Sequence, residues 1–268
     1  MFFNKCRIYK NLKAKKNVMN KQNLETNKNI INCLYSHFKS TPKKLKIVCD
    51  WDEVIQAHES YAYWEVLNEE KMIDKENYPN FSVYFKKFWE KGIIEYSPYG
   101  SKLKTSSPHL AKKQEKSKYS ENHYQKTPFL TIAKELLKLI KENKVEKTIF
   151  LSAYNKKVFP NGDGRKKQIF AETFGKYPNC SLQLVGFDSE KQGANKADWI
   201  KENAANFDIV IDDNPNILRN VIESNKKIIA CAPFYPAVKS KHQESVLLIE
   251  TSISNLKKEE FLNINNKN

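Results

Sequence analysis

The sequence lacks several features that would assign its 268 residues to a class at once. It contains no run of about eighteen apolar residues, the length that a membrane-spanning helix requires, so we expect no membrane partner. Its five cysteines show no CxxC or other metal-ligand spacing, and an odd, unpatterned set is typical of a reducing compartment. Its five histidines show no ligand spacing either. These absences argue against a membrane-spanning chain and against a metal site built from cysteine or histidine.

Arginine is scarce, although the formal net charge is +15. Only Arg7, Arg165 and Arg219 are arginines, and the other basic residues are lysines. Phosphate and base recognition usually depends on arginine. An AT-rich genome, in contrast, encodes an excess of lysine, asparagine and isoleucine at surface positions that accept many residues. A nucleic-acid partner is therefore an alternative that the charge permits but does not favour.

The first 24 residues contain seven basic residues, no acidic residue and few apolar ones. They lack the apolar centre of a secretory signal. We expect residues 1–43 to form a basic N-terminal extension that is largely disordered, in a cytoplasmic protein. The alternative is a leader that directs the protein to an organelle, and the sequence leaves open whether such a leader would be cleaved.

Short apolar segments alternate with helical patterns in the second half of the chain. Strands are expected at 45–49, 148–152, 181–187, 208–212 and 227–232. One helical pattern precedes the strand at 148–152, and a further helical pattern lies between each strand and the next from there on. This alternation predicts an α/β fold whose core is a parallel, five-stranded, Rossmann-like sheet with helices on both faces.

The part between the first two strands has a different composition. Residues 59–70 and 81–90 look helical and are rich in aromatic side chains, which favours a small separate core. Residues 101–126 have almost no apolar periodicity, so we expect a solvated, mobile loop there.

Acidic residues follow two of the predicted strands. Asp50 and Asp52 follow the first strand, and Asp212 and Asp213 follow the fourth. Ligands of such sheets bind beyond the carboxyl ends of the strands, so the two acidic pairs are expected to meet. Magnesium takes oxygen ligands, and two neighbouring carboxylate clusters predict a shared magnesium ion.

Two further polar residues occupy similar positions. Ser152 ends the second strand, and Lys196 stands at the start of a helix between the third and fourth strands. A hydroxyl and an ammonium group suggest a bound anion. A cation, an anion and a spare carboxylate together indicate phosphoryl transfer, in which one group attacks, the cation and Lys196 neutralise charge, and a neighbour moves a proton.

These residues resemble the motifs of the haloacid dehalogenase (HAD) superfamily of phosphohydrolases. The similar segments are DWDEVI at 50–55, FLSAYN at 150–155, Lys196 in GANKADW, and IVIDDNPN at 209–216. The four motifs occur in the family's order, and the likeness covers residues 45–57 and 128–232. Glu53 stands where the family commonly has glycine.

The resemblance implies a role for each motif residue. Asp50 would be the nucleophile that forms an aspartyl-phosphate, and Asp52 the general acid and base. Ser152 and Lys196 would bind the phosphoryl group. The implied magnesium ligands are Asp50, Asp52 through its backbone carbonyl, Asp212 and Asp213.

The resemblance also implies a domain layout, in which a cap that selects the substrate is inserted after the first strand. The expected parts are the N-terminal extension 1–43, a HAD-like core formed by 44–56 and 128–250, a mainly helical cap at 57–127 containing the flexible loop 101–126, and a polar C-terminal tail at 251–268.

The function expected from these residues is hydrolysis of a small phosphorylated metabolite with magnesium as cofactor. Two alternatives remain: a phosphatase that acts on nucleotides or nucleic-acid ends, and a non-catalytic HAD-like binding module, against which the intact Asp50 and Asp52 argue. Lys166, Lys167 and Lys191 lie near enough in the sequence to replace Lys196 as the phosphate-binding lysine. The sequence also leaves open the substrate, the oligomeric state and the role of the positive charge.

Overall fold

The centre of the molecule is a parallel sheet of six strands. The computed structural model describes residues 33–90, 107–187, 194–224, 228–233 and 246–262. The strands are β1 (Leu45–Cys49), β2 (Val145–Asn155), β3 (Cys180–Phe187), β4 (Ile209–Ile211), β5 (Ile229–Pro233) and β6 (Val246–Ile249). Their order across the sheet is β3-β2-β1-β4-β5-β6, and every neighbouring pair is parallel. This is the doubly wound order. From β1 the chain adds strands first on one side and then, from β4, on the other, so the topological switch point lies between β1 and β4.

The expected α/β class is thus confirmed, with one difference in the number of strands. The sequence predicts five strands, and β6 is the sixth. It has only four residues, VLLI, and periodicity alone does not identify so short an apolar run as a strand. Pairing with β5 makes it one.

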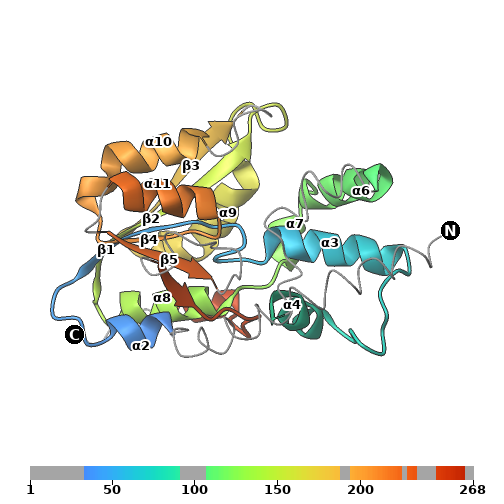
Figure 1. The fold of residues 1–268 in the computed structure, drawn as a ribbon, viewed down its shortest axis with the longest axis horizontal. Coiled ribbons are helices and arrows are strands. Elements are labelled where there is room, and N and C mark those ends of the chain that lie inside the picture. Colours follow the sequence, from blue (N-terminus) through green and yellow to red (C-terminus); the bar gives the residue numbers. More distant parts are fainter. Residues whose placement is uncertain (1–32, 91–106, 188–193, 225–227, 234–245, 263–268) are drawn as a thin grey trace, which may run out of the picture.

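Helices cover both faces of the sheet (Figure 1). The helices packed on the sheet are α2 (Leu34–Phe38), α8 (Thr131–Lys141), α9 (Gly164–Glu172), α10 (Ala194–Asn203) and α11 (Pro215–Ser224). One core cluster joins α2, α8 and α9 to the sheet, and a second joins α10 and α11 to its other face. Because both faces are covered, the central strands β1 and β4 are apolar and buried almost throughout.

Residues near both ends of the described chain contribute to the first core cluster. Leu34 and Phe38 of α2 are buried there, as are Leu256 and Phe261, the latter in a short 3-10 helix (Lys258–Phe261). Parts of 33–43 and 251–262, which the expected layout assigns to the N-terminal extension and the polar tail, thus pack their apolar side chains with those of α8. Residues 1–32 and 263–268 lie outside the described part.

Among the described residues, four helices lie between β1 and α8, and we call them the insertion helices. They are α3 (His58–Glu69), α4 (Phe81–Glu90), α6 (Pro108–Lys118) and α7 (His123–Lys126). They stand beside the sheet rather than on its faces (Figure 1). Their main core contains Phe81, Tyr84 and Phe85, with Tyr61 and Trp64 partly buried against it, as the aromatic composition suggested.

The loop expected at 101–126 is wrong for the described residues 107–126, which form α6 and α7. Pro108 occupies the first turn of α6, where proline is well tolerated. Leu110 and Ala111 are buried against Val66 of α3. These contacts supply the tertiary packing that a weak sequence pattern cannot reveal. Residues 101–106 lie outside the described part. Among the described helices, none combines the length and the apolar character needed to cross a membrane.

Candidate active site

The register of the sheet brings Asp50 beside Asp212. Cys49, the last residue of β1, is level with Ile211, the last residue of β4. The amide N–H of Asp50 donates to the carbonyl oxygen of Ile211 at 2.8 Å. The two aspartates therefore follow the carboxyl ends of two neighbouring strands, at the topological switch point of the sheet.

Lys196 joins these two aspartates. Its Nζ lies 2.8 Å from Oδ2 of Asp50 and 2.7 Å from Oδ2 of Asp212, and all three side chains are buried. Asp213 adds a third carboxylate, and one oxygen from each of Asp50, Asp212 and Asp213 lies within 4.8 Å of the others. Asp50, Asp212 and Asp213 thus lie together as the sequence predicts, and Lys196 contacts two of them.

The charges in this group are not balanced. Burial raises the pKa of Asp50 to about 7, although Lys196 lowers it, and the neighbouring Asp212 and Asp52 raise it further. Burial and the negative charges of Asp50 and Asp212 hold the pKa of Asp213 well above its usual range. Lys196 itself has a raised pKa, because its two carboxylate partners outweigh the effect of burial.

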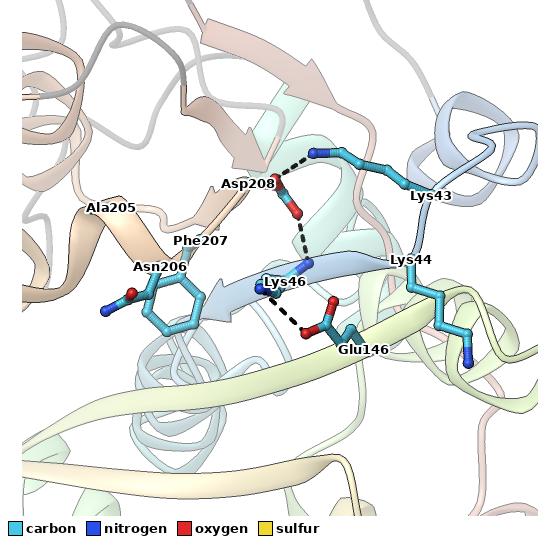
Figure 2. A pocket seen from close by; sticks show the side chains of 8 residues that line it. All are labelled: Lys43, Lys44, Lys46, Glu146, Ala205, Asn206, Phe207 and Asp208. Atoms are coloured by element: carbon cyan, nitrogen blue, oxygen red, sulfur yellow. Dashed lines mark hydrogen bonds and ion pairs between the residues drawn. The ribbon is translucent and has the colours of Figure 1, made fainter.

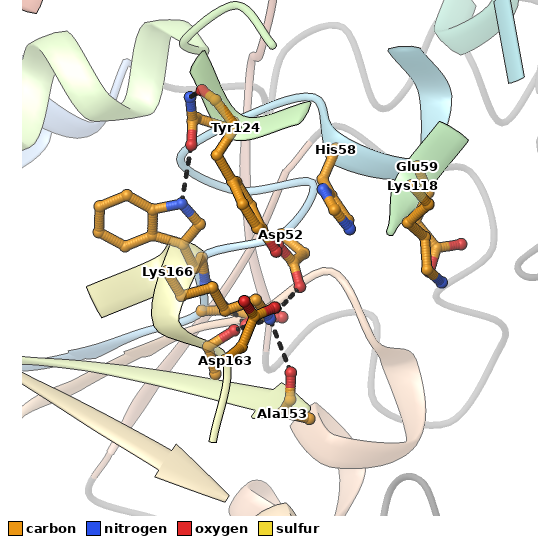
Figure 3. A network of polar contacts seen from close by, with 12 residues as sticks. Asp52, His58, Glu59, Lys118, Tyr124, Ala153, Asp163 and Lys166 are labelled. Carbon is orange, nitrogen blue, oxygen red and sulfur yellow. Dashed lines mark hydrogen bonds and ion pairs between the residues drawn. The ribbon is translucent and has the colours of Figure 1, made fainter. Parts of the chain in front are cut away.

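A second lysine, Lys166, lies against Asp52 and Ala153 (Figure 3) and also holds Ser152. The Nζ of Lys166 donates to Oδ2 of Asp52 at 2.6 Å, to Oγ of Ser152 at 2.7 Å and to the carbonyl oxygen of Ala153 at 2.6 Å. Burial acts to raise the pKa of Asp52, but the charge and hydrogen bond of Lys166 hold it well below its usual range. Ser152 lies within β2, which continues to Asn155, rather than at the end of that strand.

A tyrosine from the insertion reaches the same carboxylate. The hydroxyl of Tyr124 in α7 donates to Oδ1 of Asp52 at 2.9 Å. The Tyr124 ring stacks on His58 at 4.5 Å between centroids, with the planes 6° apart. The Nε2–H of His123 donates to the carbonyl oxygen of His58 at 3.0 Å, which fixes the start of α3.

Glu53 connects the loop after β1 to the insertion. It has φ +58°, the left-handed region that favours glycine, at the position where the resembled family commonly has one. Its buried carboxyl group accepts the amide N–H of Ser60 at 2.8 Å and so caps the N-terminus of α3. Burial raises the pKa of Glu53 to about 8, which keeps the group largely protonated at neutral pH.

The donor set fits a hard divalent cation. The site contains the carboxylates of Asp50, Asp52, Asp212 and Asp213 and the ammonium groups of Lys166 and Lys196. With all six groups ionised the net charge is −2, which is costly in a buried site unless a cation is bound. Three carboxylates in one cluster supply the oxygen ligands that magnesium prefers.

Six residues that the sequence proposes for the site lie in this region: Asp50, Asp52, Ser152, Lys196, Asp212 and Asp213. Two lysines, however, share the contacts that the sequence assigned to one. Lys196 contacts the carboxylate cluster, whereas Lys166 contacts Ser152. Lys167 is exposed, and Lys191 lies outside the described residues. Sequence reasoning missed Tyr124 altogether, because the polar, lysine-rich stretch around it gives no signal of burial.

One cavity of about 410 Å³ lies at the other end of the strands, where β1, β2 and β4 begin (Figure 2). It is lined by Lys43, Lys44, Lys46, Glu146, Ala205, Asn206, Phe207 and Asp208. Two of its three lysines are paired with acids, since Lys43 lies 2.6 Å from Asp208 and Lys46 lies 3.2 Å from Glu146. The third, Lys44, is exposed and donates to Oδ1 of Asn143 at 2.7 Å. One exposed lysine in excess does not by itself make an anion site.

Comparisons with known proteins find similarity in structure but not in sequence. No family model and no curated protein matches the chain. A candidate phosphatase from Clostridium difficile matches at 10% identity and a TM-score of 0.46, covering 80% of this chain and 96% of its own. The candidate HAD-hydrolase YfnB from Bacillus subtilis, bound to magnesium, matches at 15% identity and a TM-score of 0.40, covering 84% and 99%. A hydrolase from Streptococcus pneumoniae matches at 10% identity and a TM-score of 0.40, covering 73% and 95%.

Proposed function

We propose that this protein is a magnesium-dependent phosphohydrolase of the HAD type, which cleaves a small phosphomonoester through a phosphorylated Asp50. The observation that carries this proposal is the arrangement at the switch point of the sheet. There, a buried carboxylate (Asp50) is paired with a buried lysine (Lys196), and a second carboxylate (Asp52) lies beside it. A binding module would have no need of a second, separately held carboxylate next to the first.

Asp50 is the nucleophile in this proposal. Its carboxylate oxygen attacks phosphorus, the new O–P bond forms, and the bond from phosphorus to the leaving oxygen breaks. Lys196 and Ser152 offer the ammonium and hydroxyl groups that would hold the phosphoryl oxygens as charge moves onto them, while Lys166 holds Ser152 in place.

Asp52 moves the proton. Because Lys166 lowers its pKa, Asp52 first takes up a proton as the negatively charged phosphate enters the site, and it delivers this proton to the leaving oxygen in the first step. In the second step it takes a proton from the water that attacks phosphorus, which releases phosphate and restores Asp50. The magnesium would be held by Asp50, Asp212 and Asp213, with the carbonyl of Asp52, and would neutralise the excess negative charge and polarise the phosphoryl oxygens.

The insertion helices serve as a cap in this proposal. They reach the site through Tyr124 and through the capping contact of Glu53 with α3. The substrate is then chosen by side chains of α3, α6 and α7 that face Asp52.

The test is the intact mass of the protein after incubation with p-nitrophenyl phosphate and magnesium. We expect Asp50→Asn, which keeps the size of the side chain but removes its attacking charge, to show no turnover and no phosphate adduct. Asp52→Asn should turn over roughly 10²–10⁴-fold more slowly, because the proton shuttle is lost, and should accumulate a phosphate adduct.

Asp208→Asn is the matched control, because Asp208 lies at the other end of the strands, in the cavity of Figure 2. It should keep the wild-type rate. A phosphate adduct on the Asp50→Asn protein would show that another residue attacks, and the proposal would then be wrong.

A further inference from the structure

The two oxygens of the Asp52 carboxylate are held by groups from different parts of the molecule. Oδ2 accepts the ammonium group of Lys166 from the sheet-bound helix α9, and Oδ1 accepts the hydroxyl of Tyr124 from the insertion helix α7. The Asp52 side chain is still 25% exposed. It is therefore oriented from two sides and remains open to solvent on a third.

Tyr124 is itself fixed by its surroundings. It is almost fully buried, and its ring stacks on His58 while the guanidinium of Arg165 lies 5.4 Å from its centroid. Its backbone carbonyl accepts a hydrogen bond from the side-chain amide Nε2–H of Gln56 at 2.9 Å, which ties α7 to the loop after β1. The hydroxyl thus has little freedom to leave Asp52.

Lys166 is equally constrained. It is buried, and its three ammonium hydrogens have three acceptors: Asp52, Ser152 and the carbonyl of Ala153. The side chain of Asp163 caps α9 by accepting the backbone N–H of Arg165. This cap fixes the first turn of the helix, which carries Lys166.

We propose that Tyr124 and Lys166 are positioning residues, which clamp the Asp52 carboxylate in the plane from which it exchanges a proton with the leaving oxygen and with water. This inference rests on the proposed function. A carboxylate held through one oxygen can still rotate about its Cβ–Cγ bond, whereas bonds to both oxygens fix its plane. The insertion therefore completes the site through Tyr124, so the reaction depends on α7 as well as on the sheet.

The first experiment compares Tyr124→Phe with Tyr177→Phe. Both changes remove one buried tyrosine hydroxyl, but that of Tyr177 donates to the carbonyl of Phe261, away from the site. The phenylalanine ring at 124 can still stack on His58. We expect Tyr124→Phe to lower kcat for phenyl phosphate roughly tenfold with KM unchanged, by the usual value of one hydrogen bond. Tyr177→Phe should leave both constants unchanged.

The second measurement separates positioning from a merely structural effect. p-Nitrophenolate leaves without help from an acid, so kcat/KM for p-nitrophenyl phosphate should fall less in Tyr124→Phe than kcat/KM for phenyl phosphate. In an Asp52→Asn background, Tyr124→Phe should have no further effect on phenyl phosphate. Lys166→Met should lower kcat/KM at least as much as Tyr124→Phe does, whereas Lys167→Met, at the exposed neighbour, should not.

Two results would overturn the inference and can be told apart. If Asp50→Asn is inactive but Tyr124→Phe behaves as Tyr177→Phe does, the positioning role is wrong and the proposed function stands. If Asp50→Asn hydrolyses phenyl phosphate as fast as the wild type, the reaction that Asp52 would serve is absent, and both proposals are wrong.

Discussion

At the scale of single residues, the site is organised by two buried lysines that do different things. Lys196 lies between Asp50 and Asp212 and reduces their repulsion, while Lys166 links Asp52 to Ser152. Removing one partner of such a buried pair leaves an uncompensated charge, which is far more costly than breaking an exposed pair. The two lysines therefore cannot replace each other.

Buried histidines of the insertion make stability depend on pH. Burial lowers the pKa of His123 to about 4, and Arg165 and Lys118 lower it further, while the carbonyl of His58 and Asp52 act in the opposite direction. Its Nε2–H donates to that carbonyl, so a second proton must go to Nδ1, a buried atom with no hydrogen-bond partner among the described residues. His58 also has a pKa well below its usual range, mainly through burial.

We predict that His123→Gln makes the protein less sensitive to acid. A group whose pKa falls on folding binds more protons in the unfolded chain, so its contribution to stability is lost as the pH falls from about 6.5 towards about 4. Between about pH 7.5 and about pH 5 the wild type should lose on the order of 2 kcal/mol through His123. Urea unfolding at the two pH values measures the difference.

The exposed His37 provides the control for this measurement. His37→Gln should lose as much stability on acidification as the wild type does. An equal loss in His123→Gln and wild type would mean that His123 is not held neutral by its surroundings.

At the scale of elements, the first turn of α9 links the insertion to the sheet. The side chain of Arg165 forms a two-pronged ion pair with Asp163, at 2.9 and 2.7 Å. It also donates to the carbonyl oxygens of Lys118 and Ser120, at the C-terminus of α6, at 3.0 and 2.8 Å. A cation at a helix C-terminus satisfies carbonyls that have no partner within the helix. The next residue is Lys166, so α9 contacts both the insertion and Asp52.

We predict that Arg165→Met loosens α6 and α7 without loosening the sheet. Charge-assisted hydrogen bonds contribute about 1.5–3 kcal/mol each, so amide exchange at the end of α6 and in α7 should accelerate at least tenfold. Hydrogen-exchange mass spectrometry would resolve these peptides from those of α8, whose exchange should not change. Arg219→Met, at an exposed arginine of α11, should leave both regions as in the wild type. Uniform acceleration across the whole chain would contradict a local role for Arg165.

At the scale of the whole molecule, the unbalanced charge of the site should couple magnesium to stability. An ion that binds only the folded protein adds about 2.7 kcal/mol to the free energy of unfolding at 100 times its Kd. We therefore predict that magnesium raises the Tm by several degrees at constant ionic strength, and that a chelator reverses the gain. Sodium at matched ionic strength should not reproduce it.

Two variants connect this gain to the carboxylate cluster. Asp213→Asn should raise the Tm of the metal-free protein, because it removes one of three repelling charges, and should reduce the gain from magnesium. Asp208→Asn, at the other end of the strands, should leave the gain as it is. An equal gain in both variants would place the metal elsewhere.

The sequence by itself determined the sheet and most of the polar residues at its switch point. Strands buried on both faces must be short apolar runs, and helices packed on one side must repeat their apolar residues at helical spacing, so both leave a local signal. Asp50 and Asp212 directly follow such strands, and Asp52 lies two residues further on. Their proximity could therefore be predicted.

Only the tertiary structure decided the features that depend on contacts between distant segments. β6 is a strand because β5 pairs with it, and α6 is a packed helix because α3 covers Leu110 and Ala111. Nothing local distinguishes Lys166 from its exposed neighbour Lys167, or marks Tyr124 as buried. Their roles arise where α9 and α7 meet the loop after β1, because hydrogen bonds to Asp52 depend on positions in space that no local pattern of residues encodes.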